Sequence, residues 1–358
     1  NSPIPPASDP NAQGHYRGNG RLVADKAGAG YQLHGSQGLI RLSDAAHVLP
    51  YGQVTFGSNP ALTVKVGVNP ANGNGVPITD AVFSPTSASI VYVAPVLVTA
   101  PGYPAYQAAA KLALQSGSPP YTVQQLYGLN PRTDSRVTIS TQYNQLVFEP
   151  DFQHLREVEL DAWGSLFVLS AQATNDNDWV LVYDEGTGNS SERCILLSGG
   201  APACCASVGS TLHGPTAMAL SADGATMYLA SSVNDPAATN TTVHRLTITR
   251  GSDHAVTGLT PAGVVDVQGL RQVSALLERP STSDLWVIGT MSPTFGEYTT
   301  FNTDCATNPN CAVPMWPLLA VVPPTVTTAT AAIFNCHDLA LPISALFTAG
   351  IPCGSGDF

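Results

Sequence analysis

Four of the eight histidines stand in similar surroundings, and they are the residues of this sequence most suited to chemistry. They are His34 in LHGSQGLI, His154 in QHLREVEL, His213 in LHGPTAMA and His337 in CHDLALP, and Arg271 occupies the equivalent place in GLRQVSAL. Neutral imidazoles within bonding distance of one another bind a transition metal. A wider ring of imidazoles serves instead as acid or base toward a substrate whose carboxylate an arginine holds.

Strands are the elements expected to position these side chains. Helical periodicity is nearly absent, and in its only candidate, residues 105–115, a strand interpretation competes. Elsewhere short β-branched runs are bounded by Gly, Pro, Asn and Asp. The sequence therefore predicts an all-β protein.

One block recurs along the chain, at residues 80–94, 157–170, 216–230 and 273–289. Each copy has an alternating strand, a turn of small or polar residues, and a more continuously apolar strand. This pattern predicts a hairpin whose first strand is half buried and whose second is buried on both faces. Repeats at such spacing indicate a solenoid, a propeller or an array.

Blocks such as ALSADGATMYLASS and ELDAWGSLFVLS resemble the broad lactonase-like and NHL-like group of β-propellers. The resemblance implies a ring of blades and no single chemistry. Strands expected at 243–248 with 263–267, and at 318–322 with 329–334, would give each blade four antiparallel strands. A β-sandwich is the alternative, but its strands would not repeat in this two-strand form.

We expect one domain over residues 1–358, with six blades favoured and seven possible. The inner strands of the six blades would start near Leu39, Thr79, Glu157, Thr216, Val273 and Leu339. A seventh blade would use residues 136–141 and 145–148. Residues 1–35 would form an N-terminal arm that completes the last blade, and residues 336–358 would be the closing segment.

In such a ring the four histidines precede inner strands and would surround one mouth of the central channel. The candidate catalytic residues are then His154, His213, Arg156, Arg271 and Glu157. His34, His337 and Asp338 are candidate ligand-binding residues, and the four histidines are the candidate metal ligands. The competing interpretation is structural: a histidine at the start of a blade bonds the backbone of the neighbouring blade. Apart from that metal ion, no cofactor is expected.

Tyr103, Tyr106 and Trp316 lie among prolines and are candidate binding residues, since exposed aromatic rings stack on sugars or pack against partner proteins. The alternative is that they cover the outer edge of a blade.

The seven cysteines favour disulfides, because no C-x2-C spacing of a metal cluster occurs. The expected pairs are Cys305 with Cys311, Cys336 with Cys353, and Cys194 with Cys204 or Cys205. The sequons at Asn189 and Asn240 fall in expected polar loops, as N-glycosylation requires. Together these features predict a secreted, extracellular protein whose signal peptide has been removed.

Composition excludes two classes of function. Charged residues make up 11% of the chain and the net charge is −11, without a run of Lys or Arg, so nucleic acid is not an expected partner. The most apolar stretch, 313–326, contains four prolines and cannot span a membrane as a helix. The expected partner is an extracellular protein or polysaccharide.

Two functions remain. The favoured one is a non-catalytic extracellular interaction or structural module, because no specific catalytic motif occurs. The alternative is a secreted carbohydrate-active enzyme, a lyase or hydrolase on an acidic polysaccharide, in which Arg156 or Arg271 would neutralise a uronate. His154, His213 or Tyr143 would then move protons.

Overall fold

The computed structural model describes a chain built of β-strands, without a helix in its described residues. These are residues 21–34, 38–57, 59–99, 101, 105–127, 137–140, 145–148, 155–170, 179–184, 192–196, 206–207, 212, 215–231, 240–270, 272–279, 281–291, 316–330 and 332–333. The segment 105–115, which was the only helix candidate, is mainly strand β9 (Tyr106–Leu114). The all-β prediction is confirmed.

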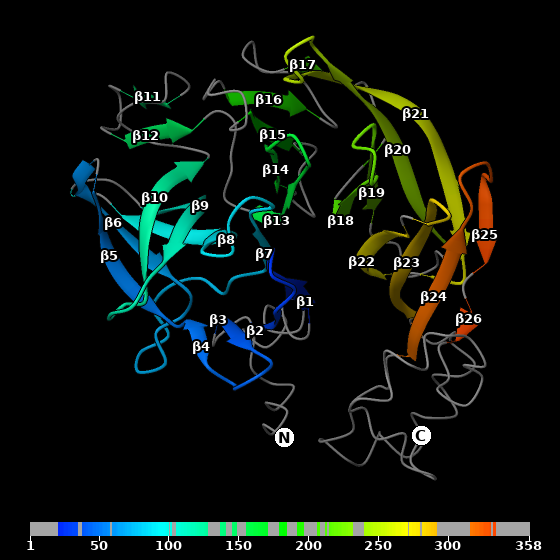
Figure 1. Ribbon diagram of the computed structural model, residues 1–358. Coiled ribbons are helices and arrows are strands. Elements are labelled where there is room, and N and C mark those ends of the chain that lie inside the picture. The colour runs from blue at the N-terminus through cyan, green and yellow to red at the C-terminus, as the bar shows by residue number, and fades with distance from the viewer. Residues whose placement is uncertain are drawn as a thin grey trace, which may run out of the picture.

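Five sheets of four to six strands follow one another along the described chain, and in Figure 1 they lie in chain order around an arc from blue to orange. The first sheet contains β1 (Arg21–Ala24), β2 (Gly30–His34), β3 (Gly38–Arg41) and β4 (His47–Leu49). The second contains β5 (Gly52–Phe56), β6 (Asn59–Val66), β7 (Asp80–Phe83), β8 (Ile90–Thr99), β9 and β10 (Tyr121–Tyr127). The third contains β13 (Leu155–Leu160), β14 (Ser165–Ser170), β15 (Trp179–Asp184), β16 (Glu192–Leu196) and β17 (Ala206–Ser207).

The last two sheets complete the described part of the arc. The fourth contains β18 (Pro215–Leu220), β19 (Thr226–Ser231), β20 (Asn240–Arg250), β21 (Val256–Gln268) and β25 (Thr328–Thr330). The fifth contains β22 (Gln272–Arg279), β23 (Asp284–Met291), β24 (Trp316–Val322) and β26 (Ala332–Ile333).

The inner strands show that these sheets are the blades of a propeller. Strand β1 contacts β7, β7 contacts β13, β13 contacts β18, and β18 contacts β22. From each inner strand the sheet runs outward mainly through antiparallel neighbours. The β-propeller prediction is confirmed. Five blades lie within the described residues, and the prediction of six blades with four strands each goes beyond them.

The recurring block forms the inner hairpin of four blades, namely β7–β8, β13–β14, β18–β19 and β22–β23. The second strand is the more buried one, as expected, since every residue of β14 is buried. Aspartates shape the turns: Asp161 Oδ1 accepts from the backbone N–H groups of Trp163 and Ser165 at 2.9 and 2.7 Å. The local sequence thus encodes the hairpins directly.

The second blade and the chain that follows it depart from a plain four-stranded pattern. The hairpin β5–β6 pairs with the C-terminal half of β8, beyond the part of β8 that pairs with β7. Strands β11 (Val137–Ser140) and β12 (Gln145–Phe148) form a separate two-stranded sheet at the position where a seventh blade was considered. These two strands were predicted correctly, and within the described chain they form a hairpin.

The first blade differs from expectation in its inner strand. Leu39 was expected near the start of an inner strand, but it lies on β3. The inner strand of this blade is β1, which contacts β7, and β3 is the third strand from the centre. Residues 21–34 of the expected N-terminal arm pair within this first sheet. The predicted closure of the last blade therefore concerns residues 1–20 and 336–358, which lie outside the described residues.

Candidate functional site

The predicted ring of histidines falls mostly outside the described residues, as do its charged neighbours. The residues concerned are His154, His213, His337, Arg271 and Asp338. His34 is described: it is half-buried at the end of β2 and pairs with Gly38 of β3. It therefore ends a second strand rather than preceding an inner one.

Arg156 and Glu157 lie at the start of the inner strand β13, as predicted. Glu157 is 5% exposed, and its Oε2 accepts from the backbone N–H of Met218 in the next blade. The carbonyl oxygen of Arg156 accepts from Thr79 Oγ1 of the preceding blade at 2.6 Å. Both residues thus take part in contacts between blades.

The same kind of contact recurs around the arc. Asp80 is fully buried, and its Oδ2 accepts from the backbone N–H of Val158 at 2.9 Å. Thr216 Oγ1 donates to the carbonyl oxygen of Val273 at 3.0 Å. Carboxylates and hydroxyls at the starts of inner strands therefore join each blade to the next, the role that the structural interpretation had given to histidines.

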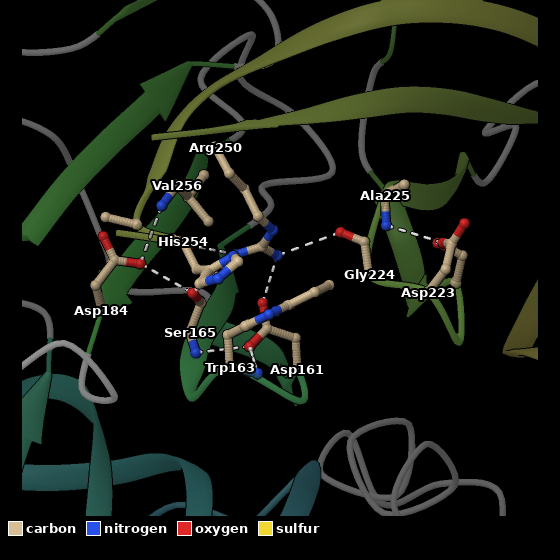
Figure 2. A network of polar contacts seen from close by, with 12 residues as sticks. Asp161, Trp163, Ser165, Asp184, Asp223, Gly224, Ala225, Arg250, His254 and Val256 are labelled. Carbon is tan, nitrogen blue, oxygen red and sulfur yellow. Dashed lines mark hydrogen bonds and ion pairs between the residues drawn. The ribbon is translucent and has the colours of Figure 1, made fainter. Parts of the chain in front are cut away.

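A second polar cluster joins the third and fourth blades at their inner hairpin turns (Figure 2). Arg250, at the end of β20, forms an ion pair with Asp161 in the β13–β14 turn. Its Nη2 also donates to the carbonyl oxygen of Gly224 at 3.2 Å, and its Nη1 donates to that of His254 at 2.9 Å. The side chain of Asp161 is 2% exposed and that of Arg250 is 12% exposed, so this ion pair is largely removed from water.

Ser165 and Asp184 extend this cluster. Ser165 Oγ donates to Asp184 Oδ1 at 2.9 Å and accepts from Arg250 Nη1 at 3.2 Å. Asp184 Oδ1 also accepts from the backbone N–H of Val256 at 3.2 Å. Although a serine, an aspartate and a histidine meet here, the His254 ring stacks on Trp163, with ring centroids 5.7 Å apart. This is not the arrangement of a serine nucleophile with a histidine base.

Trp163 packs against the Arg250 guanidinium, whose carbon lies 4.4 Å from the ring centroid. The adjacent turn of the fourth blade is held by Asp223, which accepts from Ser221 Oγ at 2.6 Å and from the backbone N–H of Ala225 at 3.0 Å. The bond from Ser221 is the main cause of a pKa of Asp223 below its usual value. These contacts make the cluster a joint between the third and fourth blades.

Gly224 is required at this joint. Its φ is +63°, and a Cβ atom there would lie 2.1 Å from Trp163 Cζ3. We expect Gly224→Ala to lower the free energy of unfolding by about 2 kcal/mol, from backbone strain and displacement of the indole. Gly28→Ala is the matched control in a urea titration, because Gly28 has a φ of +82° with no atom within 4 Å of a Cβ. Equal losses in the two variants would contradict the role of the indole contact.

Other predicted residues are placed only in part. Tyr106 begins β9, Trp316 begins β24 and Cys194 lies on β16, whereas Tyr103, Tyr143 and Asn189 lie outside the described residues. So do the cysteines Cys204, Cys205, Cys305, Cys311, Cys336 and Cys353.

Asn240 is the first residue of β20 and is half-buried. Its Nδ2 donates to Asp266 Oδ2 at 3.4 Å, so this sequon begins a strand rather than lying within a loop.

Sequence reasoning missed the joint around Arg250. Its turns were visible as DAWGS and SADGA, but Arg250 is 89 residues from Asp161. Among the described residues, no group of three or more His, Cys, Asp or Glu side chains is arranged to hold a metal ion. The described part of the chain also has no helix long and apolar enough to cross a membrane.

No family model and no curated protein matches the chain. Solved structures similar to it include hydrazine synthase from Kuenenia stuttgartiensis, with 10% identity, a TM-score of 0.43, and coverage of 89% of this chain and 67% of that one. The periplasmic gluconolactonase of Pseudomonas aeruginosa is 13% identical with a TM-score of 0.40, covering 87% and 80% of the two chains. A putative 6-phosphogluconolactonase from Bacteroides uniformis is 14% identical with a TM-score of 0.34, covering 78% and 80%.

The chain has a β-propeller fold, and proteins named as lactonases are among its distant structural neighbours. The resemblance inferred from the repeated blocks is confirmed at the level of the β-propeller fold alone, without a specific family. The blade assignment itself rests on the order of the sheets and the contacts between inner strands.

Proposed function

We propose that this protein is a secreted, glycosylated β-propeller that acts as a non-catalytic extracellular interaction or structural module. The main supporting observation is the use of Glu157: this candidate catalytic carboxylate is buried and accepts from the backbone N–H of Met218 in the next blade. Asp80 binds the backbone of the following blade in the same way. Polar groups at these positions thus hold the ring together.

Three sequence features add support for the extracellular location. Few residues are charged, seven are cysteines, and two sequons occur. We propose three disulfides with one remaining thiol, glycans on Asn189 and Asn240, and no cofactor. The partner is an extracellular protein or polysaccharide, and nucleic acid is not a partner.

The competing function is a carbohydrate-active enzyme acting on an acidic polysaccharide. In this function Arg156, which is half-buried at the start of β13, would hold a uronate carboxylate. In that case His154 and His213 would be the proton-transfer groups.

One experiment separates the two functions. The full chain, secreted from eukaryotic cells, is incubated with a panel of uronic polysaccharides while the absorbance of unsaturated products and the release of reducing ends are followed. We expect no turnover by the wild-type protein, and the same result for the His154→Ala, His213→Ala double variant. Turnover that this double variant loses would overturn the module proposal and support the enzyme.

The remaining parts of the proposal are tested on the same secreted protein. We expect Asn189→Gln and Asn240→Gln each to lose the mass of one glycan. We also expect an alkylating reagent to modify a single thiol per chain before the disulfides are reduced. Elemental analysis should find no bound transition metal. Stoichiometric metal would instead support a histidine-bound ion in the channel mouth.

We also propose that the propeller has six blades with four strands as the basic unit. The described strands give five blades, and the sequence continues beyond them on both sides, over residues 1–20 and 334–358.

A further inference from the structure

The seam between the fourth and fifth blades holds a tyrosine hydroxyl that the described chain does not satisfy. Tyr228, on β19, is 7% exposed and belongs to the buried cluster between these two blades. Its hydroxyl makes no hydrogen bond within the described chain and, unlike that of Tyr121, is not cut off from solvent. A tyrosine hydroxyl at the edge of a core normally finds a partner. An almost fully buried ring with an open polar end therefore points to a ligand.

Three charged side chains lie close to this hydroxyl. Arg245 of β20 is the cross-strand partner of Tyr228. Glu278 of β22 faces the fourth blade, where its Oε2 accepts from the backbone N–H of Ala222, and Asp223 is the next residue of that turn. Burial is the main cause of a pKa of Tyr228 above its usual value, while Glu278 and Asp223 raise this pKa further and Arg245 lowers it. All three charges thus act on the hydroxyl.

These side chains keep donors and acceptors that the described chain does not use. Arg245 Nη2 donates to the carbonyl oxygen of Pro323 at 3.1 Å, and its Nη1 and Nε make no hydrogen bond within the described residues. Glu278 Oε1 and Asp223 Oδ2 accept none there either, because each carboxylate makes its hydrogen bonds through its other oxygen. The seam therefore offers a phenol and a guanidinium as donors, and two carboxylate oxygens as acceptors, to a bound molecule.

The corresponding place between the third and fourth blades is closed and apolar. Phe167 is the third residue of β14, as Tyr228 is the third residue of β19. Phe167 pairs with Val182, and Tyr228 pairs in the same way with Arg245. At the third blade, Ile248 from the β20–β21 hairpin packs with both apolar side chains in one buried cluster. The polar pair of the fourth blade thus stands where the preceding blade has a sealed apolar pair.

The difference in cover follows from the lengths of the outer strands. Strand β20 continues over residues 248–250, past Thr247, which pairs with Thr226 at the start of β19. Strand β24 ends at Val322, opposite Leu285, the second residue of β23. The fourth blade therefore has a hairpin that overhangs its neighbour, whereas β24 of the fifth blade stops short of the polar pair.

We propose that this seam binds one sugar unit of a neutral extracellular polysaccharide through Tyr228, Arg245, Glu278 and Asp223. Neighbouring hydroxyl groups of a sugar both donate and accept, so they match a phenol and a guanidinium beside two carboxylates. Two carboxylates against one guanidinium disfavour the carboxylate of a uronate. This inference rests on the proposed extracellular interaction module and names the class of its ligand. A protein partner alone would leave the module standing and this inference wrong.

Affinity electrophoresis of the secreted full chain tests the site. Native gels contain dextran, galactomannan, arabinoxylan or mixed-linkage β-glucan as neutral probes, and polygalacturonate as the acidic probe. We expect at least one neutral polysaccharide to retard the protein, and Tyr228→Phe to raise the apparent dissociation constant at least fivefold. The urea midpoint of Tyr228→Phe should equal that of wild type, because the lost hydroxyl makes no bond within the described chain. Retardation by none of the neutral probes, or stronger retardation by polygalacturonate than by all of them, overturns the proposal.

A second variant and two controls locate the contact. Arg245→Met should weaken the same binding at least fivefold. Tyr121→Phe removes an unpartnered hydroxyl that is fully buried in the second blade, and Arg41→Met removes an exposed guanidinium from the first. Both controls should keep the wild-type affinity. Binding that survives in Tyr228→Phe and Arg245→Met, or that the controls lose equally, would place the contact elsewhere and overturn the inference. The uronic polysaccharide assay reports separately on the proposed function, because turnover there would overturn the module without removing the binding of a neutral sugar.

Discussion

Arg250→Met is expected to lower the free energy of unfolding by about 4 kcal/mol, measured by urea titration of tryptophan fluorescence. The variant leaves Asp161 as a carboxylate that is 2% exposed and has lost its cationic partner, and an uncompensated buried charge costs about 3–5 kcal/mol. It also removes the stacking of the guanidinium on Trp163 and its bonds to two carbonyl oxygens. The ion pair contributes less to the stability of the wild-type protein than its removal costs. One reason is that the buried Arg250 Nε has no hydrogen-bond partner among the described residues, and burying such a donor costs free energy.

The chain offers a matched control for this variant. Arg41 and Asp44 form an ion pair of 3.1 Å whose side chains are 39% and 49% exposed. An exposed pair contributes about 0–1 kcal/mol, so Arg41→Met should cost less than about 1 kcal/mol. Equal effects of Arg250→Met and Arg41→Met would show that the joint between the third and fourth blades does not depend on a buried charge.

A double variant separates the charge from the packing. In Asp161→Asn the side-chain oxygen can still accept from the backbone N–H groups of Trp163 and Ser165. Adding Asp161→Asn to Arg250→Met should therefore recover about half of the loss. No recovery would mean that the lost stacking and carbonyl bonds account for the whole effect.

The inner hairpins could be predicted from the sequence because the information for them is local. In 216–230, alternation of apolar residues, the turn SADG and a continuous apolar run all lie within fifteen residues. Aspartates such as Asp223 then satisfy turn amides two residues away. The generic propeller followed from the repetition of such hairpins.

Contacts between blades could not be predicted in the same way, because their partners are far apart in the sequence. Glu157 meets Met218 across 61 residues, and Asp80 meets Val158 across 78. The charged group at the start of an inner strand is recognisable in the sequence, but its sequence surroundings do not distinguish a substrate contact from a bond to the neighbouring backbone. The extra hairpin β5–β6 was missed for a related reason, since its pairing partner is the far half of β8.

The first blade shows how a local similarity can mislead. His34 shares Leu-His-Gly with His213, and the shared tripeptide suggested the same place in two blades. In the structure His34 lies at the end of β2, and the strand nearest the next blade is β1. Strand β2 alternates between half-buried and buried residues, so the pair β1–β2 lacks the continuously apolar second strand that marks the inner hairpins of the other blades.

Glu157→Leu is expected to lower the free energy of unfolding by about 3 kcal/mol. The substitution removes a charged acceptor and leaves the buried backbone N–H of Met218 without its partner, which costs about 1–3 kcal/mol for the stranded donor alone. The lost contact is one that joins the third blade to the fourth at their inner strands. Glu157→Gln should cost less than about 1 kcal/mol, because its amide oxygen can accept from the same N–H group. The measurement is again a urea titration of the two variants beside the wild type.

The comparison of these two variants also decides what Glu157 does. A blade-joining residue needs an acceptor oxygen but no titratable group, so Glu157→Gln should keep both the fold and any partner binding of the wild-type protein. A catalytic carboxylate would behave in the opposite way, since the amide cannot exchange a proton at neutral pH. Polysaccharide cleavage by the wild type that Glu157→Gln abolishes, with the stability unchanged, would therefore assign catalysis to Glu157. The contact with Met218 leads us to expect the first result, because a carboxylate held in the seam between two inner strands is placed to join blades.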